Sequence, residues 1–263
     1  MRLHLRWFTT ATRYALVEHG HNRLAMVLIA LYVPAWVTLA HLSVSPAPVR
    51  FRLWETGQLL VHRGNDLTQI SGALNAVCLI TGFMMFAATF ASGTFDRRLA
   101  MAGYSRTYLA LAKLASLAIA AAGVASYATA AIRATTTLQQ PLLVAAALFC
   151  AAMTYGALGV TLASLLDREV EGMFAIAMIS VVDIVLQNPV ISSNSGNSIV
   201  LYLPAFGAVQ AASAGAFSTT APLRCLGVQF LWFTAAALMA LFAFHRRTRN
   251  ALPPTAGADV STS

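Results

Sequence analysis

The sequence predicts an all-α polytopic membrane protein with six transmembrane helices. Of its 263 residues, 58% are hydrophobic and only 10% are charged, whereas soluble domains have about 25% charged residues. Several apolar windows approach or exceed the roughly 20 residues that a helix needs to cross a bilayer. The net charge of +8 comes from basic residues that flank these windows, as in membrane proteins generally. We therefore expect a lipid bilayer around the chain and no nucleic-acid partner.

Residues 1–23 predict an amphipathic helix that lies in the membrane interface. At helical spacing, Arg2, Arg6 and Arg13 fall on one stripe, and the aromatic and apolar residues fall largely away from it. A short helix with a basic face and an aromatic-apolar face is typical of an interfacial helix. A signal-peptide n-region is the alternative, but no convincing A-x-A cleavage site follows the next apolar run.

A six-span transmembrane domain is expected over residues 24–244. Its predicted spans are the apolar stretches at about 24–42, 67–90, 108–132, 142–165, 173–190 and 223–244. Between the first two spans, residues 51–62 predict a short surface helix. Residues 166–172 predict a tight charged turn, which is either a second cytoplasmic contact or a simple solvated turn. Residues 245–263 predict a cytoplasmic tail whose end is disordered.

The stretch at about 199–217 decides the number of spans, because it is apolar but contains Pro204, Gly207 and Gly215. If it crossed the bilayer, the two basic ends of the chain would face opposite sides, which the distribution of Lys and Arg disfavours. With six spans, 12 of the 17 Lys and Arg residues lie inside and both termini are cytoplasmic. The stretch is then a re-entrant element between spans five and six.

A polar island at residues 92–113 interrupts the apolar pattern between spans two and three. It carries five charged residues, Asp96, Arg97, Arg98, Arg106 and Lys113. The apolar patch LAMAG among them is long enough for one or two turns of amphipathic helix. A loop that only joins two spans needs no such helix, so we expect one at about 93–106 that faces a cytoplasmic partner. The alternative is that these basic residues anchor the loop to anionic lipid headgroups.

This order of parts resembles the permease subunits of the ABC-2 type, which are the membrane domains of bacterial ABC exporters. The resemblance covers nearly the whole chain in layout and is sharpest over residues 96–106. There an acidic residue and a Gly-containing turn precede the pair Ser105-Arg106, with Lys113 leading into span three. The chain departs from the family pattern in having Asp96 where Glu is commoner and Gly103-Tyr104 where a Pro is frequent.

The resemblance implies an exporter subunit in the cytoplasmic membrane of a bacterium. It would move a small-molecule, peptide or lipid-like substrate outward, for example a drug or an antibiotic, as a homodimer or a heterodimer. The sequence has no Walker A loop, so ATP and Mg would be held by a separate ABC ATPase subunit. This chain would be no enzyme by itself and would carry no cofactor or metal.

The resemblance also implies that the island is the coupling helix that docks in the ATPase cleft. Its arginines would pair with acidic rims of that cleft, and its apolar side chains would fill a small pocket. The residues assigned to this contact are Asp96, Arg97, Arg98, Leu99, Met101, Tyr104 and Arg106.

One ionisable residue, Asp183, lies well within a predicted span and is followed by Gln187 and Asn188. An Asp at a helix centre costs about 2.5–3.5 kcal/mol on insertion scales, so such residues usually face the bundle interior or water. These three residues are therefore candidates for a substrate path. Alternatively, Asp183 pairs with a nearby polar group or caps the re-entrant element.

Two other classes of function remain open on sequence, namely a secondary transporter and a non-transport membrane sensor or enzyme. A secondary transporter would favour broken helices in matching halves, and the sequence offers one such stretch rather than two. An intramembrane enzyme is disfavoured because no H-E-x-x-H occurs and no span pairs an evident Ser nucleophile with His. A neighbouring reading frame with a Walker A loop would favour the exporter.

Overall fold

The computed structural model describes residues 9–10, 12–14, 17, 23–191 and 198–249. Most of the amphipathic helix predicted for 1–23 lies outside these residues, although the six described residues between 9 and 17 are helical. The predicted disorder at the end of the tail, over 252–263, also lies outside them.

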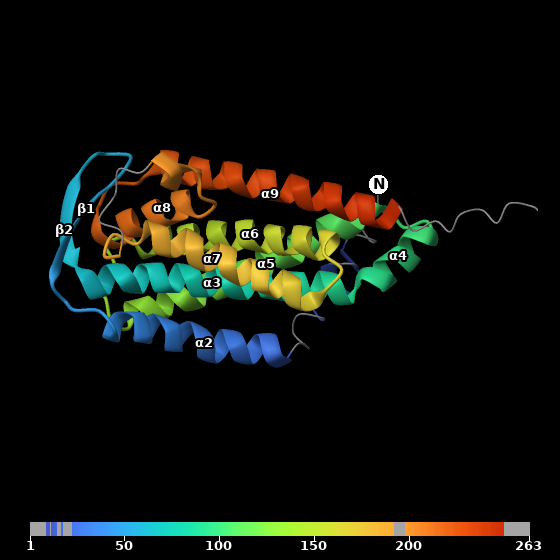
Figure 1. The fold of residues 1–263 in the computed structure, drawn as a ribbon, viewed down its shortest axis with the longest axis horizontal. Helices are drawn as coiled ribbons and strands as arrows, with labels where there is room; N and C mark the ends of the chain where they lie inside the picture. Colours follow the sequence, from blue (N-terminus) through green and yellow to red (C-terminus); the bar gives the residue numbers. More distant parts are fainter. Residues whose placement is uncertain (1–8, 11, 15–16, 18–22, 192–197, 250–263) are drawn as a thin grey trace, which may run out of the picture.

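Six helices of 19 or more residues run along the long axis of the described chain (Figure 1). They match the predicted apolar stretches to within a few residues: α2 Arg23–Leu42, α3 Gly64–Ala91, α5 Arg106–Arg133, α6 Pro141–Leu165, α7 Glu169–Gln187 and α9 Leu223–Arg249. Among the described residues, α3, α5, α6 and α9 are long and apolar enough to cross a membrane. The chain is therefore a helical protein of the membrane-embedded kind, while a count of six spans goes beyond this finding.

The core of the bundle forms where α6 packs against α3 and α9. Tyr155 on α6 and Leu74 on α3 are fully buried there. Gly159 lies so close to α3 that an added Cβ would sit 2.4 Å from the carbonyl oxygen of Gly82. Small residues allow helix backbones to approach in this way, and van der Waals packing then holds the helices together.

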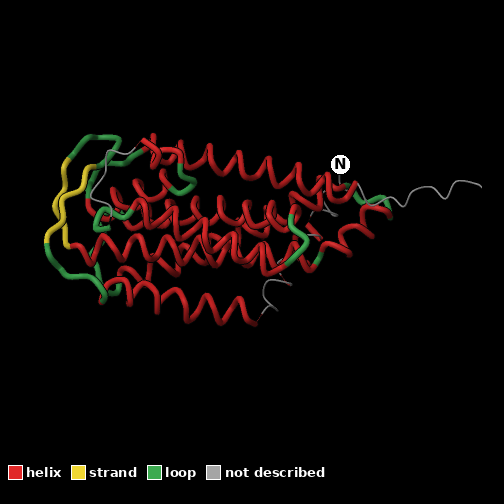
Figure 2. Tube along the Cα trace, in the orientation of Figure 1, coloured by secondary structure: helices red, strands yellow, loops and turns green. Residues whose placement is uncertain are grey.

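A β-hairpin replaces the short helix predicted over residues 51–62, so that prediction is wrong. Strands β1 (Pro48–Arg52) and β2 (Leu59–Arg63) pair antiparallel at one end of the bundle (Figure 2). Phe51 is buried between the exposed Arg50 and Arg52, which is the period-two alternation of a strand. Gly57 has a φ of 65° in the turn, a conformation that glycine adopts without steric cost.

The hairpin is tied to the ends of two helices. Its Trp54 ring packs edge-on against Phe206, with 5.7 Å between ring centroids. The Glu55 carboxylate accepts backbone N–H bonds from Arg224 at 3.1 Å and Cys225 at 3.3 Å. These N–H groups belong to the first turn of α9, where the helix dipole favours a negative charge.

The stretch at 199–217 is broken, as its proline and glycines predict. It forms a 3₁₀ helix η1 (Ser198–Tyr202) and a 12-residue helix α8 (Phe206–Phe217). At 1.5 Å per residue, α8 is about 18 Å long, too short for a hydrocarbon core of about 30 Å. Nearly all of α8 is buried, and it packs against α6 and α9. Its re-entrant placement in a membrane stays a prediction.

Two predicted boundaries need correction. The charged turn at 166–172 is shorter, because α7 begins at Glu169 and places Glu169 and Glu171 in its first turn. Carboxylates are favoured at that end of a helix. The last helix continues past the predicted span end at 244 to Arg249, so the first part of the tail is helical. Within it, the Arg247 guanidinium donates to the carbonyl of Ala163 and lies 5.8 Å from the Phe90 ring centre.

The connections sort onto two ends of the bundle. Helix α4 (Gly93–Met101), the turn at 166–168 and the end of α9 lie at one end, and the hairpin lies at the other (Figure 1). The first end therefore gathers Arg97, Arg98, Arg168 and Arg246. A six-span topology with its basic segments on one side requires this arrangement.

Candidate functional site

Helix α4 occupies the first part of the polar island and stands at the end of the bundle, between α3 and α5 in the chain (Figure 1). It is shorter than the helix predicted over 93–106, because it ends at Met101 and Arg106 already belongs to α5. Gly103 follows with a φ of 89°, and the Tyr104 N–H donates to the carbonyl of Leu99 at 3.0 Å. A left-handed glycine with this bond is a Schellman ending, which stops a helix and reverses the chain.

The outward face of α4 combines apolar and basic side chains. Phe95 is 62% exposed and Met101 is 59% exposed, and both Arg97 and Arg98 are exposed. Phe95 was not among the predicted contact residues. Its spacing of three residues from Arg98 is the signal that could have found it, because residues three apart are neighbours on the surface of a helix.

The inward face of α4 packs against the bundle. Leu99 and Tyr104 pack against a small apolar cluster formed by Leu109, Ala110 and Phe244. Leu99 was predicted to fill a pocket on a partner, and the structure instead places it against its own chain. Burial raises the pKa of the Tyr104 phenol above its ordinary value.

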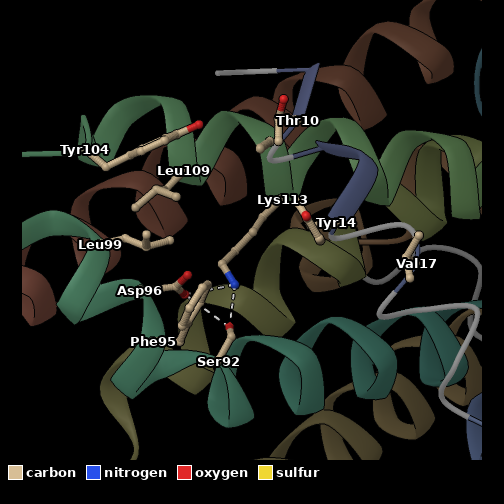
Figure 3. Close-up of a pocket in the computed structure, with 11 residues that line it drawn as sticks. Thr10, Tyr14, Val17, Ser92, Phe95, Asp96, Leu99, Tyr104, Leu109 and Lys113 are labelled. Atoms are coloured by element: carbon tan, nitrogen blue, oxygen red, sulfur yellow. Dashed lines mark hydrogen bonds and ion pairs between the residues drawn. The ribbon is translucent and has the colours of Figure 1, made fainter. Parts of the chain in front are cut away.

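A buried polar cluster joins α4 to both neighbouring helices (Figure 3). The Lys113 ammonium lies 3.0 Å from Oδ2 of Asp96 and donates to the Ser92 hydroxyl at 2.6 Å. The Ser92 hydroxyl in turn donates to Asp96 Oδ2 at 3.1 Å. Asp96 is only 5% exposed, so the carboxylate predicted to contact an ATPase is paired inside the chain. We call Ser92, Asp96 and Lys113 the α4 lock.

A pocket of about 500 Å³ opens beside the α4 lock (Figure 3). Its walls come from α4, the start of α5 and the N-terminal segment, which contributes Thr10, Tyr14 and Val17. Most of the other lining side chains are apolar, among them Phe95 and Leu109. The pocket thus brings the N-terminal segment next to the helix that was predicted to couple to a partner.

The structure buries Asp183 and surrounds its carboxylate with donors. Asp183 is 1% exposed, and its Oδ2 accepts from the Tyr155 hydroxyl at 2.5 Å and from the Ala205 N–H at 2.9 Å. The Gln187 amide donates to the other carboxylate oxygen at 2.5 Å. Asp183 therefore connects α7 to α6 and to the start of α8. Asp183 was predicted either to line a substrate path or to pair with a polar group or cap the re-entrant element. The observed contacts are those of the second role.

A second cavity, of about 480 Å³, lies between α2, α3 and α7. Of the three predicted path residues, Asn188 lines it, whereas Asp183 and Gln187 are not among its lining residues. Trp36 and Ile184 supply apolar walls, and Asn75 adds a polar group. The described residues that line this groove include no charged side chain. We call it the α2–α7 groove.

Comparison with known proteins does not indicate a function, so the function is inferred from the fold, from α4 with its lock, and from the α2–α7 groove. No protein-family model matches the chain, and no curated protein matches it. Among the described residues, no group of three His, Cys, Asp or Glu side chains is placed to hold a metal ion. What the protein does has to be inferred from α4, the α4 lock and the arrangement of the long helices.

Proposed function

We propose that this chain is the membrane-spanning permease subunit of an ABC exporter of the ABC-2 type. It moves a small-molecule, peptide or lipid-like substrate outward, using ATP hydrolysis by a separate ABC ATPase subunit that binds α4. ATP and Mg belong to that subunit, and this chain carries neither a cofactor nor a catalytic site. The complex resides in the cytoplasmic membrane of a bacterium, with α4 and both termini in the cytoplasm.

The observation that carries the proposal is α4 itself. The chain places residues 92–105 between α3 and α5, although connections between packed helices commonly take about 2–8 residues. The extra residues form a helix that presents an exposed Phe95 and Met101 next to two arginines. A central aromatic anchor flanked by cations fits a cleft with an apolar floor and an acidic rim.

The proposal assigns six membrane crossings to α2, α3, α5, α6, α7 and α9. Helix α7 has 19 residues and is therefore about 28 Å long, close to the roughly 30 Å thickness of the hydrocarbon core. The gathering of basic segments at the α4 end supports a cytoplasmic position for that end. The short, buried α8 supports a re-entrant element between the fifth and sixth crossings.

The substrate path is proposed along the α2–α7 groove, where a second permease subunit, identical or different, covers it. Helix α7 presents exposed apolar residues at intervals of four, three and four, namely Phe174, Met178, Val181 and Val185. Such a stripe is the geometry with which two helices pack side by side. Because the described residues that line the groove carry no charge, it favours a neutral or lipid-like substrate over a cation.

Charge reversal on α4 tests this proposal. We expect the double variant Arg97→Glu, Arg98→Glu to retain less than about a tenth of the wild-type association with its ATPase, because like charges brought together across an interface cost several kcal/mol. The measurement is co-purification with an ABC ATPase, from membranes that express both chains.

The double variant Arg50→Glu, Arg52→Glu is the matched control. These two arginines are also exposed, but they lie on β1 at the opposite end of the bundle. The control is expected to bind the ATPase as the wild type does. Wild-type binding by the α4 variant, or equal loss in both variants, would remove α4 from the contact.

A further inference from the structure

We infer that the α4 lock is a positioning device that sets the direction in which α4 presents its outward face. This inference rests on the proposed function only for its consequence, namely that the ATPase meets Phe95 and Arg98 at a fixed angle. The lock itself is a property of this chain. Its three members come from the end of α3, from α4 and from α5, so that one cluster ties all three helices together.

The lock is the charged connection between α4 and the bundle. Of the ion pairs between described residues, the Asp96–Lys113 pair alone involves a residue of α4. Both side chains are shielded from solvent, with 7% of the Asp96 and 12% of the Lys113 side chain exposed. The Ser92 hydroxyl adds one hydrogen bond to each partner, because it accepts from the Lys113 ammonium and donates to the Asp96 carboxylate. Breaking such a pair on one side leaves an uncompensated buried charge, which is strongly unfavourable.

A second attachment point makes the direction of α4 definite. Leu99 lies about one helical turn beyond Asp96 and packs into the apolar cluster with Leu109 and Phe244. With the lock near the start of α4 and Leu99 near its end, one face of the helix is fixed at two points. Arg98, which is exposed, is thereby held away from the bundle, and Phe95 is held at the wall of the pocket with much of its ring exposed.

The Asp96–Lys113 ion pair is better explained by specificity for one orientation of α4 than by a contribution to stability. A buried ion pair is weak evidence for stability, because apolar residues of similar volume often hold a structure equally well. Its better attested use is to specify one arrangement over others. Here the alternatives are other tilts of α4, for which the neighbouring pocket of about 500 Å³ leaves room.

The mobility of a spin label on α4 tests the lock without any partner. A nitroxide label is placed at Met101→Cys, and protein that lacks this substitution shows any signal from the native cysteines. We expect Asp96→Asn and Lys113→Met each to increase the mobility of the label. The exchanged variant Asp96→Lys, Lys113→Asp restores the pair and is expected to return the label to nearly its original mobility. Arg133→Met, a charge removed from the far end of α5, is the control and leaves the label unchanged.

The complex with the ATPase provides the functional readout. In Asp96→Asn, we expect the substrate exported per ATP hydrolysed to fall by about tenfold, corresponding to about 1.4 kcal/mol of coupling, while the ATPase still co-purifies. A role in stability alone would lower the yield of folded complex and leave this ratio unchanged. The exchanged variant is expected to recover the ratio.

The two proposals fail in different ways. An unchanged label mobility in both single variants, or no recovery in the exchanged variant, would overturn the lock even if the ATPase binds normally. If the label responds as expected but the wild-type chain binds no ATPase, the lock stands and the proposed function fails.

Discussion

The Asp183→Ala variant is expected to unfold at a clearly lower temperature than the wild type. The substitution removes the acceptor for two buried donors, the Tyr155 hydroxyl and the Ala205 N–H, and one of two acceptors of the part-buried Gln187 amide. A buried donor left without an acceptor costs about 1–3 kcal/mol, so the total is a large part of the stability of a single domain. The measurement is thermal unfolding of the purified protein in one detergent.

Tyr155→Phe is the matched control, because it removes one donor and leaves the carboxylate bonded to Ala205 and Gln187. Its unfolding temperature is expected to lie between those of the wild type and Asp183→Ala. The same pair of variants separates the two roles of Asp183. An Asp183→Ala protein as stable as the wild type but unable to export substrate would assign the residue to the substrate path and contradict its structural role.

Gly159→Ala is expected to destabilise the bundle by separating α6 from α3. The new Cβ would lie 2.4 Å from the carbonyl oxygen of Gly82 and 3.1 Å from the backbone nitrogen of Phe86. Neither backbone atom can swing away as a flexible side chain would. Overpacking of this kind costs about 1–3 kcal/mol, and the effect is measured as a lower unfolding temperature in the same assay.

Gly123→Ala is the control for the second prediction. Gly123 lies within α5, and a Cβ added there meets no atom within 4 Å. Alanine also favours a helix over glycine by about 1 kcal/mol in soluble hosts, so this variant should be at least as stable as the wild type. Similar losses in both variants would show that the α3–α6 contact is looser than its geometry indicates.

The long helices could be predicted closely, because a change in composition marks where an apolar stretch begins and where it ends. The fourth apolar stretch was expected at 142–165, and α6 is Pro141–Leu165, since a proline suits the first turn of a helix and a polar turn follows its end. Pro204 similarly marks the break between η1 and α8. These signals are local, and bilayer thickness limits the length of an apolar helix.

The hairpin could not be predicted in the same way. The segment at 51–62 is short, and its apolar residues suit one side of a helix as well as alternate positions of a strand. Contacts far away in the sequence stabilise the strand form, because the rings of Phe51 and His62 both pack against Phe217, with centroids 6.1 Å and 4.4 Å away. Such tertiary contacts commonly override local preference.

The position of the candidate site was predicted from the sequence, but some of the residues expected on its outward face point inward. Its charges and its LAMAG patch predicted a helix, which α4 is. The pairing of Asp96 with Lys113 could not be predicted, because these residues are 17 positions apart and the turn at Gly103 lies between them. With Asp96 and Leu99 turned inward, the outward face belongs to Arg97, Arg98 and Met101, and the exposed Phe95 lies between this face and the pocket.

Photo-crosslinking from α4 is the most direct test of the proposal that this helix docks on an ATPase. Phe95, which is 62% exposed, is replaced by the photoreactive residue benzoylphenylalanine, and Trp54, which is 46% exposed on the hairpin, is replaced in a second protein. Illumination of membranes that contain both chains is expected to join the ATPase to the chain labelled at position 95 and not to the chain labelled at position 54. A crosslink from position 54 alone, or none from position 95 in a complex that co-purifies, would contradict the account.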